Sequence, residues 1–583
     1  MPRGMSDSEK RRWRERSHHA DHVWREKGLS GDEAGQSGSI VKFLDAYRGD
    51  QWKHIGWLNG VDMDSHLVIN SMFAAANTME AQLLARLPRV SVFGKTQATA
   101  STARSFEQLL NWGIVETKAE RAWNAALRDA FFRFGVVRLL YVPPEEMYAK
   151  SGERVVFGSS TTSDLPELRR VAPWDIRIDP LAESWAADAD ATWCEFISLY
   201  TVDQLKKMPG VSVPKDLVPT ISKDKRTIDE RRRKDQYMYE AANLVEVRTV
   251  YDLAERKWFQ WSPGSEKLLR EPSDWPEVYK GLEGLPYAIL GFNDPSDDVC
   301  PMGYAEIVWP LQVERNKVRT LLSELVRRHR RIIVANKSAF NDDVERTKIT
   351  DGDIAEVFWA QGDVGQAIRE IPVAGMDQGL LLYDTLIQED IRETIGQSKM
   401  ARAQRINVES ATEAARVGAG DDVQSGRNQS KAEAWLRDSI RLFAKGIQAL
   451  PDTRWIVPLL GAQDAASLMA GVPAVLQLSS AEIQGEYLFD IEVGSTLPRN
   501  DRQEIAKSMA WLQIAQQFPQ NTNIPAALLD TAIAMDKDPQ TALMNAEQVA
   551  ATNQALAGQP EVESGPGGIN PAAFMGGGGG SMQ

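Results

Sequence analysis

The chain has 583 residues, of which 43% are hydrophobic and 25% charged, and its formal net charge is −14. This length and composition predict two to four globular domains and exclude a collagen, a disordered tail protein and a small disulfide-stapled toxin. Nucleic-acid binders are usually basic, so the acidic balance argues against a surface that grips DNA tightly. The 17 Trp and 17 Met indicate large packing contacts, although a sugar-binding surface rich in tryptophan would give the same count.

The number of cysteines and the hydropathy of the sequence indicate the cellular compartment in which the protein is expected. The two cysteines, Cys194 and Cys300, lie far apart in the sequence and have no Cys or His neighbour at ligand spacing. We therefore expect neither a disulfide framework nor a zinc site, as suits a reducing cytosol. The N-terminus has no apolar run typical of a secretory signal, and no apolar stretch reaches the roughly 18 residues of a membrane span. We expect synthesis in the cytoplasm and no contact with a membrane.

Residues 1–36 mix Lys, Arg, Glu and Asp and run into the sequence GDEAGQSGS. We interpret them as a flexible charged N-terminal arm, made of a solvated helix and a joint. His18, His19 and His22 lie at a helical spacing that a metal could use, but in so charged a helix we expect them to be solvated. No metal site is predicted here or elsewhere.

Residues 37–300 are predicted to form a domain in which helices precede strands. Apolar spacing of three and four residues predicts helices from Ser37 to Arg86 and from Ser101 to Phe134, and Asn70 or Ser71 is placed to cap one that stops before Pro88. Short β-like runs separated by Pro, Gly or polar turns follow at 135–142, 154–157, 171–179 and 244–251, with helical segments at 201–207 and 225–242. The predicted fold class is α+β and multi-domain.

Two long helices that bracket a small β segment are the most informative feature. The first spans 304–331 and contains Pro310, where we expect a kink or a new start. Strand-like runs fill 332–377, and a second amphipathic helix spans 378–395. The first helix ends in a basic cluster, which either complements the helix dipole or contacts a phosphate backbone. The cluster consists of Arg327, Arg328, Arg330 and Arg331.

The remainder of the chain is predicted to be mainly helical. A polar loop at 396–409 carries Lys399, Arg402 and Arg405. Ser410 and Glu413 have the spacing of a capping box, which opens a helix that continues to about residue 450. Strands are predicted at 454–460 and 487–493, helices from 498 to 553 with Trp511 and Leu512 on an apolar face, and a disordered Gly-rich tail at 557–583.

The sequence lacks the common motifs of catalytic sites. It contains no GxxxxGK[ST] phosphate loop, no HExxH and no GxSxG. Asp175 and Asp179 could serve as the paired carboxylates of a glycoside hydrolase, but their Pro-rich surroundings fit a strand edge and its turns more simply. We therefore expect a protein that is not an enzyme and has no cofactor, with a glycoside hydrolase as the alternative.

A set of motifs, taken in order, resembles the portal proteins of tailed bacteriophages. The set extends over about residues 37–520 and surrounds the helix–β–helix unit. Its members are YRGDQW (47–52), LVIN (67–70), PRVSVFG (88–94), VAPWDIRIDP (171–180), FNDP (292–295), Gln312 and Asn316 in the first long helix, SATEA (410–414) and FDIEVGSTLP (489–498). Residues 1–36 and the Gly-rich tail have no fixed counterpart in that family.

The resemblance implies a ring of twelve copies at one capsid vertex, through which a motor packages DNA and from which DNA is later ejected. Residues 37–300 and 410–497 would form the wing, 498–556 a helical crown, and the long helices at 301–331 and 378–395 the stem. Residues 332–377 would form the clip, and 396–409 a tunnel loop facing DNA.

The implied location is the virion, after assembly in the host cytoplasm. The implied partners are weakly bound double-stranded DNA, the terminase large subunit, the major capsid and scaffolding proteins, and tail adaptor proteins. Lys399, Arg402 and Arg405 would touch DNA transiently. The clip would dock partners through acidic residues, namely Asp342, Asp343, Glu345, Asp351 and Asp353. Another virion component, such as a tail adaptor, is a further alternative.

Overall fold

The computed structural model describes most of the chain in segments. These are residues 5–29, 39–59, 65–141, 165–220, 244–328, 331–336, 355–360, 368–371, 378–396, 411–450, 454–458, 475–491 and 501–517, with residues 527, 528, 531 and 535. The chain divides into two compact units, one of Met1–Arg454 with Leu478–Pro498 and one of Trp455–Gln477 with Arg499–Gln583. Helices and mainly antiparallel sheets confirm the α+β class. No helix in the described segments combines the length and apolarity needed to cross a bilayer.

The first unit begins with helices, some of which start with a side-chain cap. They are α1 (Asp7–Glu26), α2 (Ser39–Arg48), α3 (Trp52–Ile55), α4 (Ser71–Leu83), α5 (Gln97–Glu116) and α6 (Ala119–Phe132). Asn70 caps α4 as predicted, because its side-chain oxygen accepts the Phe73 N–H at 3.0 Å. The single helix predicted from 101 to 134 is instead two helices. Lys118 separates them with a φ of 55°, a left-handed conformation that a helix interior excludes.

Two antiparallel sheets follow in the same unit. The three-stranded sheet has the order β3 (Glu167–Val171), β2 (Gly135–Leu140), β9 (Tyr287–Leu290). The five-stranded sheet has the order β4 (Ile176–Ile178), β5 (Trp193–Thr201), β6 (Leu244–Asp252), β7 (Lys257–Trp261), β8 (Arg270–Asp274). The short helices α7 (Val202–Lys207) and α9 (Glu277–Lys280) lie in the connections. The strand predicted at 171–179 is broken by a turn in which the Asp175 N–H donates to the Ala172 carbonyl at 2.8 Å.

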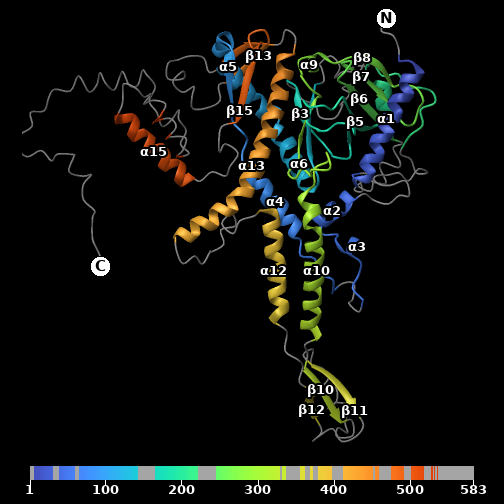
Figure 1. Ribbon diagram of the computed structural model, residues 1–583, viewed down its shortest axis with the longest axis vertical. Coiled ribbons are helices and arrows are strands. Elements are labelled where there is room, and N and C mark those ends of the chain that lie inside the picture. Colours follow the sequence, from blue (N-terminus) through green and yellow to red (C-terminus); the bar gives the residue numbers. More distant parts are fainter. Residues whose placement is uncertain are drawn as a thin grey trace, which may run out of the picture. The chain divides into compact units, whose positions relative to one another are not determined.

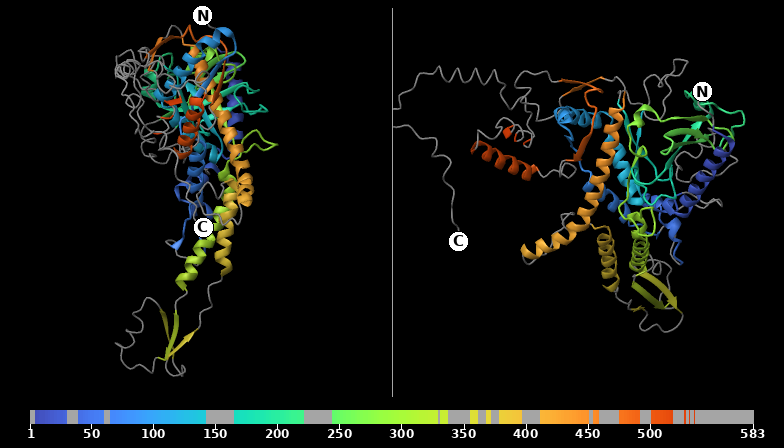
Figure 2. Two further views of the ribbon diagram at one scale, coloured as in Figure 1. Left: turned by 90° about the vertical axis from the view of Figure 1, so that its left-hand side faces the viewer. Right: turned by 45° about the horizontal axis from the view of Figure 1, so that its top comes forward.

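Helix α1 packs against the five-stranded sheet, and Figures 1 and 2 show it running alongside these strands. Ser17, Ala20 and Trp24 are buried, and the Trp24 ring stacks on Trp185 with centroids 4.9 Å apart. The expectation of a solvated arm is therefore wrong for residues 5–29. The exposed face of α1 is as charged as predicted, but its other face has partners that lie more than 140 residues away in sequence, such as the Pro173 carbonyl that accepts from the Trp24 indole.

Two strands at distant sequence positions form a separate two-stranded sheet in the first unit. β1 (Val90–Gly94) runs antiparallel to β15 (Tyr487–Ile491), with Val90 opposite Ile491. Helix α5 packs on β1, and the Phe106 ring lies 5.0 Å from the ring of Tyr487. The pairing joins two of the motif segments of the sequence analysis, PRVSVFG and FDIEV.

The helix–β–helix unit consists of α10 (Tyr304–Arg328), a three-stranded sheet and α12 (Gln378–Ile395), and the long α13 (Ala411–Gln448) follows. The sheet order is β11 (Ala355–Ala360), β10 (Arg331–Asn336), β12 (Ile368–Ile371), with β10 parallel to β11 and antiparallel to β12. In Figure 1 the two helices run side by side and the sheet follows their far ends. α10 continues through Pro310, so of the two expected alternatives, a kink or a new start, the new start is excluded. It ends before the predicted boundary, because Arg331 already belongs to β10.

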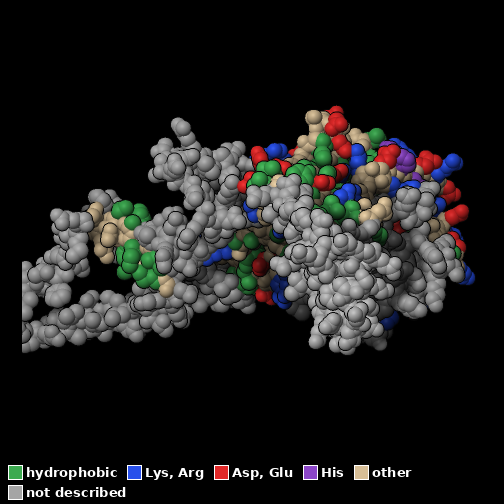
Figure 3. Space-filling view, turned by 90° about the horizontal axis from the view of Figure 1, so that it is seen from below, with side chains coloured by type: hydrophobic (Ala, Val, Ile, Leu, Met, Phe, Trp, Pro, Cys, Tyr) green, Lys and Arg blue, Asp and Glu red, His purple; other side chains and the backbone are tan. Residues whose placement is uncertain are grey.

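The second unit is described in part. β13 (Arg454–Pro458) and β14 (Val475–Ser479) pair as a two-stranded sheet, and α15 (Asp501–Gln517) follows. Hydrophobic side chains on α15 are visible at the left of Figure 3, and Met509, Trp511 and Ile514 are exposed. Trp511 was predicted on an apolar face, and in this helix its side chain is exposed to solvent.

Candidate functional site on the paired helices

One face of α10 carries three buried polar side chains at a spacing of four residues. Gln312, Asn316 and Thr320 accept hydrogen bonds from backbone N–H groups of an extended segment, at 3.2, 2.9 and 3.0 Å. The donors are Ser71, Ile69 and Leu67. Four helical residues rise about 6 Å, and two extended residues advance about 6.7 Å, so the two repeats nearly match. The helix thus fixes the register of the segment that leads into α4.

Gln51 completes this polar network. Its side-chain oxygen accepts from the amide of Gln312 at 2.9 Å and also from the amide of Asn316, while its own amide donates to the Ala46 carbonyl at 3.0 Å. Asn70 adds a link through its amide, which donates to the Tyr47 carbonyl at 2.8 Å. Three motif segments therefore meet here: YRGDQW, LVIN, and the helix with Gln312 and Asn316. Buried amides are stable only when partners satisfy them, which gives a physical reason for these residue types.

The contact between α10 and α12 combines an ionic centre with an apolar seam. Arg315 Nε lies 3.4 Å from one carboxylate oxygen of Asp384, and Arg319 Nε lies 3.3 Å from the other. Arg315 also donates to the Ser71 hydroxyl at 2.6 Å. Burial lowers the pKa of Arg315, against the attraction of Asp384. The buried apolar residues of the two helices include Val318, Leu322, Ile387, Ile391 and Ile395.

Both helices also expose large apolar side chains. Six of them have exposed fractions between 42% and 66%: Leu321, Leu325, Val326, Leu382, Tyr383 and Leu386. Single exposed apolar residues are common on soluble proteins, but several on two adjacent helices are typical of a surface that binds another protein. We refer to these six residues as the open stem face.

The basic cluster predicted at the end of α10 is not a single feature. Arg327 and Arg328 are the last two residues of the helix, where a positive charge suits the helix dipole. Arg331 opens strand β10, so assigning it to the helix end was wrong, and Arg330 lies outside the described residues. The cause is that arginine favours helix and no Gly or Pro marks the boundary.

Most other predicted site residues lie outside the part of the chain that the structure describes. These are the loop residues Lys399, Arg402 and Arg405, the β-segment residues Asp342, Asp343, Glu345, Asp351 and Asp353, and the capping residue Ser410. Glu413 lies in the first turn of α13, which begins at Ala411 as a cap at residue 410 requires. The side-chain contacts of Glu413 also lie outside the described part.

Asp175 and Asp179, the carboxylates of the hydrolase alternative, flank strand β4. The Asp179 carboxylate accepts the N–H groups of Leu181 and Thr192, at 3.1 and 3.3 Å, and thereby holds the turn after β4. The main chain of Asp175 is bound as well, since its carbonyl accepts the Ile197 N–H at 2.8 Å. These contacts agree with the interpretation of the pair as a strand edge and its turns.

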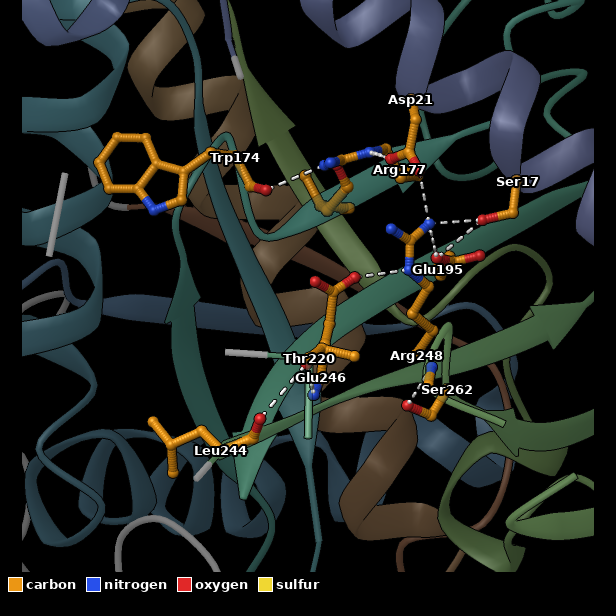
Figure 4. A network of polar contacts seen from close by, with 12 residues as sticks. Ser17, Asp21, Trp174, Arg177, Glu195, Thr220, Leu244, Glu246, Arg248 and Ser262 are labelled. Carbon is orange, nitrogen blue, oxygen red and sulfur yellow. Dashed lines mark hydrogen bonds and ion pairs between the residues drawn. The ribbon is translucent and has the colours of Figure 1, made fainter. Parts of the chain in front are cut away.

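Sequence reasoning missed an ionic network between α1 and the five-stranded sheet (Figure 4). Arg177 donates to Asp21 at 2.7 Å, and Arg248 lies 2.9 Å from the other Asp21 oxygen and 3.1 Å from Glu195. Ser17 donates to Glu195 at 3.1 Å, and Arg248 Nε donates to Glu246 at 2.7 Å. A signal was present in the sequence, because an arginine inside an apolar strand such as LVEVRTVYD needs a buried partner.

The two buried carboxylates of this network are shifted in opposite directions. Burial raises the pKa of Glu195, more than Arg248 and Ser17 lower it, and among the described residues its Oε2 has no hydrogen-bond partner. Burial also acts to raise the pKa of Asp21, but Arg177 and Arg248 together outweigh it and hold that pKa below its ordinary value. Asp21 is thus ionised and binds α1 to the sheet, whereas burial destabilises the ionised form of Glu195.

The paired helices combine a closed side with an open one. Toward residues 67–71 their polar groups are fully used within the chain, whereas the open stem face exposes apolar side chains. An element built this way holds its own position and offers apolar area to another surface. Comparison with known proteins finds no family model and no curated protein that matches this chain.

Proposed function

We propose that this chain is the portal protein of a tailed bacteriophage, which forms a ring-shaped DNA channel at one capsid vertex. The observation that supports this most is the unit α10–β10–β11–β12–α12, two long helices around a small sheet, with the open stem face on both helices. The proposal assigns the helices to the stem, the sheet to the clip, and the loop that carries Lys399, Arg402 and Arg405 to the tunnel.

A ring of identical chains needs an interface in which two different surfaces of each copy meet and the rotation closes. The open stem face supplies apolar area for one such surface, and its exposed side chains would be buried between neighbouring stems. Burial of apolar area stabilises by about 25 cal/mol per Å², so six large side chains repeated at every interface would contribute substantially. The saturated network around Gln312 and Asn316 would keep each stem in register with its own wing.

Charge agrees with a channel that passes DNA without holding it. Twelve copies would carry 12 × −14 = −168 formal charges, and residues 332–377 contain nine acidic against four basic residues. Each phosphate that a protein neutralises adds salt-dependent affinity, which would act as friction on moving DNA. An acidic conduit with a few cations in its tunnel loop avoids that. In the virion its partners would be the terminase large subunit, the capsid and scaffolding proteins, and the tail adaptors.

Mass photometry with negative-stain imaging tests the ring. We expect a species near twelve times 64.9 kDa, about 780 kDa, with end-on rings that have a central hole. Leu325→Glu with Leu386→Glu should reduce that species to the monomer, because two charges would enter each apolar interface. Leu181→Glu is the matched control, since Leu181 is 82% exposed and lies outside the paired helices. A chain that remains monomeric at every concentration, also with scaffolding and capsid proteins, would overturn the proposal.

The channel role has a separate test. Reversal of Lys399, Arg402 and Arg405 to Glu should leave rings intact but reduce DNA filling or retention in assembled heads, because the tunnel would lose its transient contacts with phosphates. Heads that fill normally with this variant would remove the loop from the mechanism while leaving the ring in place.

A further inference from the structure

A cavity of about 370 Å³ in the first unit lies between the three-stranded and the five-stranded sheet. Its walls come from β2, β3, β5 and α7, and they are rich in arginine. The residues that matter for its chemistry are Arg138, Arg169, Arg170, Asp175, Phe196 and Tyr200. A volume of this size is within the usual range of small-molecule sites, roughly 300–1,000 Å³.

Two of the arginines face each other directly. Arg138 of β2 is the cross-strand partner of Arg169 in β3, and like charges at opposed positions destabilise an antiparallel pair. Burial lowers the pKa of Arg169, and repulsion from Arg138 lowers it further, against the attraction of Glu167 and Tyr200. Within the described residues neither arginine forms an ion pair.

Arg138 is held in place but not satisfied. Its guanidinium lies 4.8 Å from the centroid of the Phe196 ring, and its Nε is buried and has no hydrogen-bond partner in the part of the chain that the structure describes. A buried donor left without a partner costs about 1–3 kcal/mol, more when it is charged. The strand pair therefore retains two unfavourable features at one place, a repulsion and an unused donor.

The charge of the third arginine, Arg170, is compensated by a carboxylate. Arg170 Nη2 donates to Asp129 at 2.7 Å, and its Nε donates to the other oxygen of the same carboxylate. Asp175 adds attraction to Arg170. The charge of Arg170 is thus balanced within the chain, and the positive charge that remains in the cavity belongs to Arg138 and Arg169.

We propose that this cavity binds a small phosphorylated ligand, with the phosphate group between the guanidinium groups of Arg138 and Arg169. Phosphate oxygens would accept from guanidinium N–H groups of Arg138 and Arg169, and the negative charge would remove the repulsion across the strand pair. Guanidinium groups present several donors in a planar fork that matches phosphate, which a lysine would not. The proposal uses the two sheets of the first unit alone and does not depend on the ring.

The test is ligand binding by the full chain at constant ionic strength. The probes are inorganic phosphate, pyrophosphate and adenosine monophosphate, with chloride as reference, and the readouts are calorimetric affinity and thermal unfolding. We expect a phosphate probe to bind and to raise the unfolding temperature of the wild type. Arg169→Gln should lose at least about tenfold in affinity, the measure of one charged hydrogen bond. Without ligand it should unfold at an equal or higher temperature, because the repulsion is gone.

Arg121→Gln is the matched control, since Arg121 is an exposed arginine on α6 and should leave affinity unchanged. Tighter binding of adenosine monophosphate than of inorganic phosphate would identify a phosphate ester, and equal binding would identify the phosphate group alone. The proposal is overturned if no probe stabilises the wild type beyond chloride. It is also overturned if Arg169→Gln and Arg138→Gln both bind as the wild type does.

Discussion

Helices α1 and α10 are both held by buried polar side chains, but by different chemistry. α1 is fastened to the five-stranded sheet by charges, with Asp21 between Arg177 and Arg248. α10 is fastened to residues 67–71 mainly by neutral amides and a hydroxyl at regular spacing, with one charged donor, Arg315, on the Ser71 hydroxyl. A buried ion pair is sensitive to pH and to the loss of one partner, whereas an amide ladder mainly specifies register. The position of α1 is therefore conditional on charge, and the register of α10 is not.

The largest effect is expected for Arg248→Met, which tests whether charges hold α1 on the five-stranded sheet. Removal of Arg248 leaves Glu195 and Asp21 with less compensating charge in a buried site, and breaking such a network by removing one partner costs about 3–5 kcal/mol. Urea unfolding should show this loss, and hydrogen exchange should show faster exchange in α1. Arg11→Met is the control, because its pair with Glu15 is exposed, and it should change stability by less than about 0.5 kcal/mol. Equal effects of the two changes would contradict a special role for the network.

Asn316→Ala tests the series of neutral hydrogen bonds between α10 and residues 67–71. The variant leaves the half-buried Ile69 N–H without its acceptor, so we expect a loss of about 1–3 kcal/mol. The loss should stay constant across mildly acidic and neutral pH, because no titrating group is removed. Lys317→Ala on the same helix serves as control, since Lys317 is partly exposed. A loss that varies with pH would show that charge also contributes to the attachment of α10, as it does to that of α1.

The pH dependence of α1 docking should have two opposite components. Glu195 has a raised pKa, so the folded chain holds its proton above the ordinary value of 4.5, and unfolding free energy falls as pH rises through that window. Glu195→Gln should abolish this fall. Asp21 has a lowered pKa, so its stabilisation is present above 3.8 and is lost as pH falls through its folded pKa, a loss that Asp21→Asn should remove. Unfolding curves over a pH series would check both signs.

The smallest expected effect is that of Thr320→Val, which keeps the shape and removes only the acceptor for the Leu67 N–H. We expect about 1 kcal/mol and faster hydrogen exchange at Leu67. Exchange at Ile69 should change less, because its acceptor Asn316 remains. Uniform acceleration from 67 to 71 would mean that the ladder acts as one cooperative unit rather than as separate bonds.

Sequence reasoning succeeded where structure is local. The apolar spacing of 378–395 predicted α12 with its observed bounds, and the observed cap of α4, Asn70, is one of the two predicted candidates. It failed where the structure depends on the backbone conformation of a single residue or on a partner that is distant in the sequence. The break at Lys118 depends on one left-handed residue that need not be glycine, and the docking of α1 depends on arginines in strands far along the chain.

The candidate site follows the same division. Gln312 and Asn316 were noted as part of a motif, but their partners at 67–71 could not be identified, because only the folded chain shows that the helical and extended repeats match. Most of the charged residues predicted to contact DNA or to dock partners lie in connections outside the described segments. Such connections have no periodicity from which a position could be inferred.

The pairing of β1 with β15 constrains the order of events during synthesis. About 400 residues separate Val90 from Ile491, so at typical rates of 5–20 residues per second β1 waits roughly 20 to 80 s for this partner. During that time an apolar strand has no mate from its own nascent chain among the described strands, and it is a candidate for protection by chaperones. The first unit is complete only after residue 491 has left the ribosome, so its finished surface becomes available only when most of the polypeptide has been translated.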